Sequence, residues 1–280
     1  DSGMIRPEAA EWKLLTDLIQ ARFGLTFDRV RSEILEARLR PRLRDLHLQS
    51  LREYYHYLRF HPEREVELGR LSSLITNNET YFFRESHHFD VLVRHVMPER
   101  RPGLASRPFQ LLSAGCSSGE EPYSAVIAFQ NAGFELAGVR WEIDACDLNA
   151  DRIAQARQAV YDGGSLRACD EEARRRYFKE VGGRFQLRER HRKGVRFFEQ
   201  NLLAPAGTLG WGTYDAILCR NLLIYFSDEA FDGLIARFAR SLRPGGYLLL
   251  GHSESLLDRT TDFVPVSFGT GLVYRKAPPN

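Results

Sequence analysis

A short stretch near the middle of the chain, LLSAGCSSGEEPYS over residues 111–124, most strongly limits how this sequence can fold. Residues 109–113 are expected to form a buried strand, small residues follow, and a helix is expected to begin near Glu120. In α/β proteins a strand that runs through a glycine turn into a helix commonly holds a nucleotide-like ligand. Glycine lets the backbone approach the ligand, and the helix start offers unpaired N–H groups. The stretch therefore predicts an α/β domain with a ligand-binding turn.

The charges of this loop disfavour a phosphate ligand. No G-x-x-x-x-G-K-[ST] pattern is present, and no Lys or Arg lies between Ser113 and Ser124. The loop ends instead in Glu120 and Glu121, which would repel a phosphate and attract a cation or a sugar hydroxyl. S-adenosylmethionine carries an ammonium, a sulfonium and a ribose without a phosphate, so it is the first ligand hypothesis. An ordinary strand–turn–helix with surface acids explains this loop equally well.

The bulk properties allow one large or two modest domains of a protein that does not insert into a membrane. The chain has 280 residues and a net charge of +2, and no apolar run is long enough to span a bilayer. The four cysteines are scattered without a C-x-x-C pair. This favours buried thiols in a reducing cytoplasm over a disulfide framework or a metal site.

The first part of the chain, residues 4–97, has a helical pattern and is expected to form a separate all-helical domain. Pro41 is expected to kink or restart its second helix. A Pro-, Gly- and Arg-rich segment over 98–108 is expected to be a linker.

Arginines outnumber acids along the second helix of this domain. Three of them, Arg31, Arg38 and Arg42, are candidate docking residues for an acidic partner. A solvated helix face is the competing interpretation, and both stay open at this point.

Residues 109–280 alternate strands and helices, which predicts a doubly wound sheet, and two final strands without an intervening helix suggest an antiparallel edge. Residues 161–199 interrupt this alternation. Two strand-like runs there, 184–189 and 194–199, flank the basic residues 191–193. We expect a small β-rich insertion in which these two runs form a hairpin with a basic tip.

Polar residues stand at the ends of two predicted strands of the main domain. Asp147 ends the second strand, where this architecture hydrogen-bonds a ribose, and Arg220 and Asn221 follow the apolar strand over 214–219. In open α/β sheets the ligand lies outside the carboxyl ends of the strands, so these residues are candidates for the same site.

Six motifs taken together resemble the CheR family of chemotaxis receptor glutamate methyltransferases, in order and over nearly the whole chain. The motifs are NETYFFRESHHF (78–89), GEEPYS (119–124), DLN (147–149), NL (201–202), CRNLLIYF (219–226) and GHSE (251–254).

The resemblance implies an N-terminal helical domain followed by a methyltransferase domain that carries a small β-subdomain. It implies methyl transfer from S-adenosylmethionine to glutamate side chains on the cytoplasmic helical bundle of methyl-accepting chemoreceptors, with S-adenosylhomocysteine as product. The expected protein is a cytoplasmic monomer that acts in chemotaxis-like signalling, binds no nucleic acid and does not insert into a membrane.

The resemblance also assigns residues. Arg84 and Tyr225 match the positions nearest the methyl-transfer site, and Gly115 is interpreted as leaving room for the methionine moiety. The residues expected to bind the cofactor are Asn78, Thr80, Arg84, Gly115, Glu120, Asp147, Asn201, Leu202, Arg220 and Asn221.

The chemistry implied by the resemblance needs no general base. A glutamate with a pKa of about 4.3 is already ionised at neutral pH, so the enzyme has to align the reacting groups and exclude water. This agrees with the lack of a Ser-His-Asp or Cys-His constellation and of a metal-binding motif.

Some family members capture a short peptide at the receptor C-terminus with the β-subdomain. The segment over 181–189 looks shorter than in those members, so we expect a form that does not depend on this tether.

Two other functions compete with this one. A nucleic acid methyltransferase would carry an N/D-P-P-Y/F run where this chain has Arg220-Asn221-Leu222-Leu223, and no stacking platform is visible. A non-catalytic regulator on the same scaffold is the second alternative, since a fold does not guarantee an activity.

Overall fold

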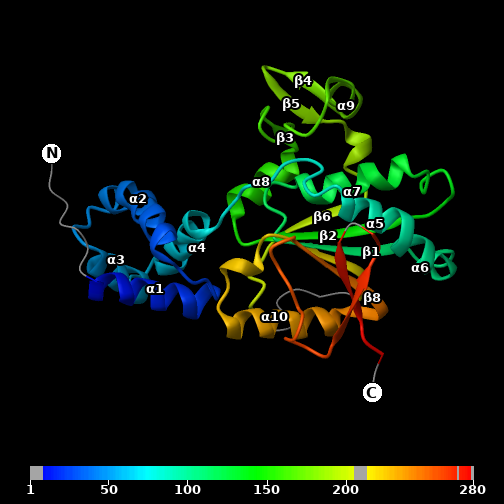
Figure 1. The fold of residues 1–280 in the computed structure, drawn as a ribbon. Coiled ribbons are helices and arrows are strands. Elements are labelled where there is room, and N and C mark those ends of the chain that lie inside the picture. Colours follow the sequence, from blue (N-terminus) through cyan, green and yellow to red (C-terminus); the bar gives the residue numbers. More distant parts are fainter. Residues whose placement is uncertain (1–8, 205–212, 270, 279–280) are drawn as a thin grey trace. The chain divides into compact units, whose positions relative to one another are not determined.

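The computed structural model describes residues 9–204, 213–269 and 271–278 (Figure 1). The chain divides into two units, which are described one at a time. A helical unit ends at Asn77 and also includes Tyr225–Phe231. A sheet unit contains Asn78–Ile224 and the chain from Asp232 onward.

Four helices form the described part of the helical unit up to Asn77. They are α1 (Ala9–Phe23), α2 (Arg29–Asp45), α3 (Leu51–Phe60) and α4 (Arg64–Ile75). Asp28 caps α2 by accepting from the Arg31 N–H at 2.8 Å, and Ser50 caps α3 in the same way. Buried leucines at helical spacing, Leu35, Leu39 and Leu43, turn one side of α2 into the core. The helix runs through Pro41 without ending and restarting there.

The sheet unit is built on seven strands in the order β6-β2-β1-β7-β8-β10-β9. Their bounds are β1 (Phe109–Ala114), β2 (Trp141–Asp147), β6 (Val195–Glu199), β7 (Tyr214–Cys219), β8 (Leu242–Leu250), β9 (Phe263–Ser267) and β10 (Leu272–Lys276). Strands β6, β2, β1, β7 and β8 pair in parallel, whereas β10 pairs antiparallel with both β8 and β9. The doubly wound sheet with an antiparallel edge is therefore confirmed.

Helices accompany this sheet (Figure 1). They are α5 (His87–Val91), the π-helix η1 (Leu92–Val96), α6 (Met97–Leu104), α7 (Glu120–Asn131), α8 (Ala150–Gln158), the 3₁₀ turn η3 (Leu223–Tyr225) and α10 (Asp228–Ser241). None of the helices in the described ranges combines the length and the apolarity that crossing a membrane requires.

The division between the units lies twenty residues earlier than the expected domain boundary at residue 97. The reason is that Phe89, Leu92 and Met97 are buried in the same core as Phe109 of β1. Most of the expected linker is helix α6, and Arg107 after it donates to the buried Asp215 at 2.7 Å. These residues therefore anchor the sheet unit.

A second, three-stranded sheet has the order β3-β5-β4 and lies beside helix α9 (Figure 1). Its elements are β3 (Val160–Tyr161), α9 (Glu171–Tyr177), β4 (Phe178–Val181) and β5 (Arg184–Leu187), followed by the 3₁₀ turn η2 (Glu189–His191). A small β-rich insertion is thus present, but the expected hairpin of 184–189 with 194–199 is wrong. β5 pairs with β4 across Gly182 and Gly183, whose φ values are +59° and +75°.

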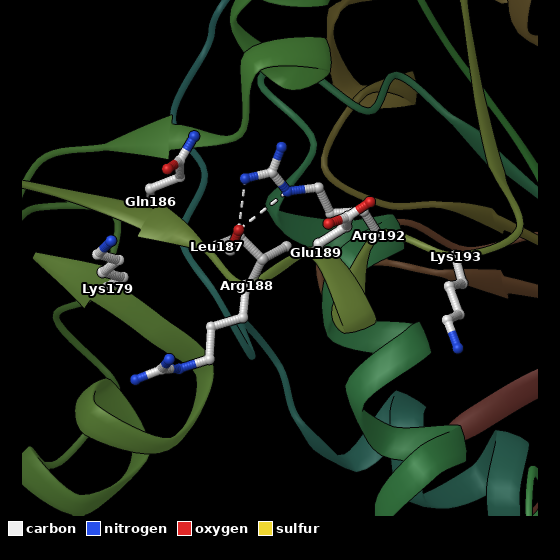
Figure 2. A pocket seen from close by; sticks show the side chains of 7 residues that line it. All are labelled: Lys179, Gln186, Leu187, Arg188, Glu189, Arg192 and Lys193. Carbon is white, nitrogen blue, oxygen red and sulfur yellow. Dashed lines mark hydrogen bonds between the residues drawn. The ribbon is translucent and has the colours of Figure 1, made fainter. Parts of the chain in front are cut away.

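The run after the basic residues instead joins the main sheet as β6, parallel to β2. Gly194 makes this possible, because a Cβ there would lie 2.7 Å from the Trp141 carbonyl oxygen. A groove of about 680 Å³ opens beside β4 and β5 (Figure 2).

Candidate functional site

The predicted cofactor residues follow the carboxyl ends of adjacent strands. β6, β2, β1 and β7 are parallel neighbours, so the residues after them meet at one edge of the sheet. Asn201, Asp147, Gly115 and Arg220 occupy these positions in that order. The structure therefore brings together four residues that are widely separated in the sequence.

The loop between β1 and α7 has an unusual backbone. Gly115, Ser117 and Gly119 have φ values of +75°, +48° and +92°. A Cβ on Gly119 would lie 3.0 Å from the Ala156 Cβ, so both the conformation and the packing require glycine there. A serine with positive φ costs conformational energy and is a frequent mark of functional loops.

Asp147 fixes this loop. Its carboxylate accepts from the Ser117 N–H at 2.8 Å and from the Asn149 N–H at 2.9 Å. Asn149 in turn caps α8 and donates from Nδ2 to Oδ1 of Asn78 at 3.3 Å. The segment that begins with Asn78 is therefore linked to the edge of the sheet.

Glu120, at the start of α7, is 1% exposed. Its carboxylate accepts from the Ser118 hydroxyl at 2.8 Å and from the Ser165 hydroxyl at 2.9 Å. Burial raises the pKa of Glu120 and also that of Asp147, against the hydrogen bonds that favour the ionised forms. Within the described ranges neither carboxylate forms an ion pair.

These observations fit S-adenosylmethionine. The charge of Arg152 favours the ionised form of both buried carboxylates, but neither forms an ion pair with a described residue, and such groups suit a ligand that brings positive charge and hydroxyl groups. The loop between them holds no basic side chain, and Ser117 Oγ is buried without a hydrogen-bond partner in the part of the chain that is described. A phosphate would meet two carboxylates and no cation in this loop.

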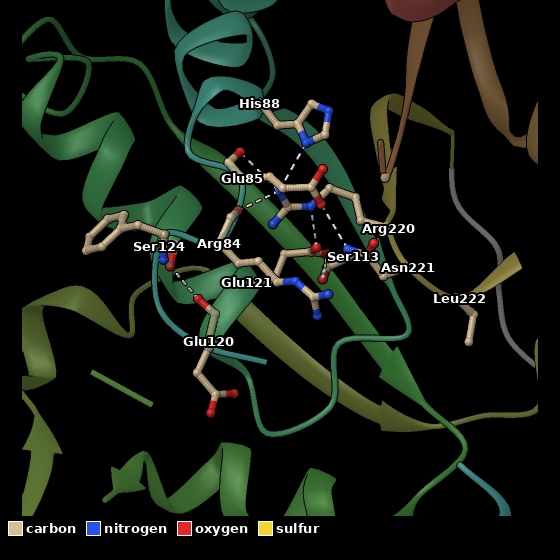
Figure 3. Close-up of polar contacts among 12 residues, drawn as sticks. Arg84, Glu85, His88, Ser113, Glu120, Glu121, Ser124, Arg220, Asn221 and Leu222 are labelled. Atoms are coloured by element: carbon tan, nitrogen blue, oxygen red, sulfur yellow. Dashed lines mark hydrogen bonds and ion pairs between the residues drawn. The ribbon is translucent and has the colours of Figure 1, made fainter. Parts of the chain in front are cut away.

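Arg220 lies at the centre of a buried cluster (Figure 3). Its Nε donates to Glu121 at 2.8 Å, and its Nη1 donates to the Arg84 carbonyl at 2.7 Å and to His88 Nδ1 at 3.0 Å. Its side chain is 3% exposed. The Arg220 guanidinium therefore holds the Arg84 backbone and pairs with Glu121, so the cation that Glu121 attracts is a residue of this chain.

Asn221 and Glu254 complete the turn after β7. Asn221 has φ +59° and donates from Nδ2 to Glu85 at 2.9 Å. Burial alone would raise the pKa of Glu85, but hydrogen bonds from Asn221 and the His252 N–H outweigh it and lower this pKa to about 2. The Glu254 carboxylate accepts from four backbone N–H groups, those of Gly251, Asn221, Leu222 and Leu223.

Sequence reasoning assigned no role to Glu254, although it ends one of the six motifs. An acid four residues after the end of a buried strand was the only available signal.

Arg84 differs from Arg220 because its charge is not neutralised. Its Nη1 donates to the Glu79 carbonyl at 2.7 Å, and no ion pair reaches it from the described residues. In Figure 3 its side chain lies near Glu121 and Arg220.

Three further predicted cofactor residues are Thr80, Asn201 and Leu202. Thr80 is half-buried in the same segment as Arg84, and the Asn201 Oδ1 accepts from the Leu203 N–H at 3.0 Å. Leu202, which follows Asn201, is buried.

Tyr225 belongs to the helical unit. Its hydroxyl accepts from Asn77 Nδ2 at 2.6 Å, and its carbonyl accepts from the Thr26 N–H at 2.9 Å. The Arg31 guanidinium lies over the Tyr225 ring at 4.3 Å and over the Phe27 ring at 4.8 Å, and it also donates to the Thr26 carbonyl. Arg31, one of the three candidate docking residues, is thus half-buried against a candidate catalytic residue.

The other two candidate docking residues also make internal contacts. Arg42 donates to both oxygens of Glu67, at 2.9 and 2.6 Å, and Glu67 is 2% exposed and also bonded to Tyr54. Arg38 is exposed and donates to the Leu74 carbonyl at 2.8 Å. Docking through Arg42 would have to break its buried pair, whereas Arg38 remains available at the surface.

Three potential metal ligands lie together beside this cluster, although no metal was expected. Ligand atoms of Glu85, His87 and His88 are within 4.8 Å of one another. The Arg220 guanidinium already donates to His88 Nδ1, and this positive charge opposes a second cation.

Comparison with known proteins gives matches along nearly the whole chain. Residues 10–76 match the family model "CheR methyltransferase, all-alpha domain", and residues 78–271 match "CheR methyltransferase, SAM binding domain". The boundary between the two matches agrees with the division at Asn77.

Three relatives illustrate the similarity. The chain is 36% identical over 260 residues to a probable biofilm formation methyltransferase, WspC, of Pseudomonas aeruginosa. These residues are 92% of this chain and 60% of that protein. It is 36% identical to chemotaxis protein methyltransferase 2 of Vibrio cholerae, over 86% of this chain and 83% of that one. It is 32% identical to a chemotaxis protein methyltransferase of Vibrio parahaemolyticus, over 95% of this chain and 96% of that one.

Proposed function

Because the chain belongs to the CheR methyltransferase family, we propose that it methylates glutamate side chains on the cytoplasmic helical bundle of chemoreceptors, forming methyl esters. S-adenosylmethionine is the cofactor of the matched domain. The observation that carries the proposal is the match of both family models in order, over a site whose two buried carboxylates, Glu120 and Asp147, form no ion pair within the described ranges.

S-adenosylmethionine supplies the methyl group on a sulfonium, a leaving group that departs without protonation. On the protein side, Asp147 and Glu120 would hold polar groups of the cofactor, and the small loop over 115–119 would let the backbone approach it. Arg84 carries a charge without an ion pair within the described chain, which suits a carboxylate of the ligand or of the substrate. Tyr225 is proposed to contact the substrate carboxylate through its hydroxyl.

The partner is proposed to be the cytoplasmic domain of a methyl-accepting receptor, so the protein would act in the cytoplasm, as a monomer. Basic residues of α2, with Arg38 the exposed one among the three candidates, would face acidic flanks of a receptor helix. We keep the proposal that a receptor C-terminal tether is not required, which the short turn at Gly182 and Gly183 supports.

The decisive experiment incubates the full chain with tritium-labelled S-adenosylmethionine and receptor cytoplasmic fragments, with and without the terminal peptide. We expect base-labile volatile label on fragments of both kinds. A receptor fragment whose methylatable glutamates are replaced by alanine is the matched control and should stay unlabelled. Labelling of RNA or DNA would refute the proposal, and cofactor binding without labelling of any substrate would favour a regulator. If fragments without the terminal peptide take up much less label than fragments with it, tether independence is refuted and the proposed methylation stands.

A further inference from the structure

Positive charge is concentrated in one short segment of the sheet unit. Residues 174–193 contain nine Lys or Arg and two Glu, a net charge of +7, although the whole chain carries only +2. The rest of the chain is therefore net acidic. Such a local excess creates a strong potential at one surface and favours an anionic ligand there.

The guanidinium groups of this segment are positioned without being neutralised. Arg188 donates to the Arg175 carbonyl at 3.0 Å, and Arg192 donates from Nε to the Leu187 carbonyl at 2.9 Å. Lys179, Arg188 and Arg192 form no ion pair with any residue of the described ranges, whereas Lys193 is 3.4 Å from Glu135. Bonds to carbonyls fix the direction of an arginine and leave its charge for a ligand.

These cations surround a concave surface. The groove has a volume of about 680 Å³ and is lined by Lys179, Gln186, Leu187, Arg188, Glu189, Arg192 and Lys193. Figure 2 shows the basic side chains coming from β4, from the residue after β5 and from the segment after η2. Four lining residues are basic and one is acidic, and the volume is in the usual range for small-molecule sites.

We propose that this groove binds a small molecule through a diphosphate group. Two linked phosphates carry about three negative charges, and three of the lining cations, Lys179, Arg188 and Arg192, form no ion pair within the described ranges. Arginine binds phosphate oxygens in a bidentate way, and four basic residues line one groove here. An extended acidic peptide would spread single charges along its length, and a flat bilayer would not reach into a groove.

The lining also limits what else the ligand contacts. Leu187 is the one apolar residue in the lining set, and no aromatic side chain belongs to it. The groove therefore recognises the phosphates rather than a stacked base. This site is separate from the edge of the seven-stranded sheet and does not depend on the proposed methyl transfer.

The test is calorimetric titration of the full chain with inorganic pyrophosphate, ADP and orthophosphate at one ionic strength. We expect saturable binding of pyrophosphate and ADP, weaker binding of orthophosphate, and a loss of about tenfold or more in affinity in the K179Q/R188Q variant. The matched control is R175Q/R176Q, which removes two charges from the same segment outside the lining set. It should bind like the unchanged protein.

Several outcomes would overturn the proposal. They are the lack of saturable pyrophosphate binding to the unchanged chain, an equal loss in both double variants, and binding of anionic vesicles or a polyglutamate peptide without binding of pyrophosphate. S-adenosylhomocysteine affinity, measured on every variant, should not change. This readout separates a folding defect, or a failure of the cofactor assignment, from a failure of the groove proposal.

Discussion

At the scale of single residues, Arg31 has two possible roles that predict different kinetics. Its guanidinium stacks on Tyr225 at 4.3 Å and on Phe27 at 4.8 Å, so we expect it to position Tyr225. Arg31→Ala should then lower kcat about tenfold and leave KM for the receptor fragment nearly unchanged. A docking residue would raise KM instead. Steady-state kinetics with a receptor fragment distinguish the two.

Arg38→Ala is the matched control, because Arg38 lies on the same helix and is exposed. Docking through this face predicts a higher KM and an unchanged kcat for that variant. If Arg31→Ala raises KM and spares kcat as Arg38→Ala does, the positioning role is refuted. Partial recovery of kcat by Arg31→Lys would support it, since a lysine retains a cation over the ring.

Glu120 gives the second prediction at this scale. Burial raises its pKa, so acidification protonates it at a higher pH than an exposed glutamate. Binding of a cationic cofactor needs the ionised form, so affinity for S-adenosylmethionine should fall as pH drops through this raised pKa. Glu120→Gln should bind more weakly at pH 7.5 and lose much of the pH dependence between 7.5 and 5. Calorimetry measures the affinity at pH 7.5 and its change down to pH 5. If the affinity of the variant changes with pH as much as that of the unchanged chain, Glu120 is not in the cofactor site.

At the scale of elements, the turn after β7 depends on one carboxylate. Glu254 accepts from four backbone N–H groups and is 8% exposed. Glu254→Ala would leave several buried donors unsatisfied, which costs at least about 2 kcal/mol of the free energy of unfolding. Urea denaturation should measure this loss, and Glu180→Ala, at an exposed position of β4, should change it by less than about 0.5 kcal/mol. Equal effects of the two substitutions would contradict this role of Glu254.

The elements also show what the sequence could predict. The strand–loop–helix around Gly115 and Gly119 was predictable because its strand pattern, glycines and helix start are all local. The pairing of residues 194–199 with β2 was not predictable, because it depends on the close approach of Gly194 to the Trp141 carbonyl, and Trp141 is distant in the sequence. The partner of Arg42 is Glu67 on another helix, so an arginine count on α2 could not separate structural from exposed guanidinium groups. The same holds for the candidate site: the apolar strand pattern places Asp147 and Arg220 at strand ends, but it does not predict that Arg220 pairs with Glu121.

At the scale of the whole molecule, buried histidines should make stability depend on pH. Burial and the charge of Arg220 lower the pKa of His88 to about 3, and burial and Arg190 lower that of His191 to about 4. The unfolded chain takes up these protons near pH 6.5. Below that pH the unfolded state binds more protons than the folded state, so the histidines' contribution to stability is lost as pH falls toward these lowered pKa values.

For His88 this linkage amounts to about 2 kcal/mol between pH 7 and pH 5. The raised pKa values of Glu120, Asp147 and Glu254 act in the opposite direction, because those groups take up protons while folded. Comparison with a variant isolates the histidine from this background. His88→Gln keeps an acceptor for Arg220 and does not titrate, so its free energy of unfolding in urea should fall less between pH 7 and pH 5 than that of the unchanged chain. Identical slopes would mean that His88 takes up its proton as readily in the folded chain as in the unfolded one.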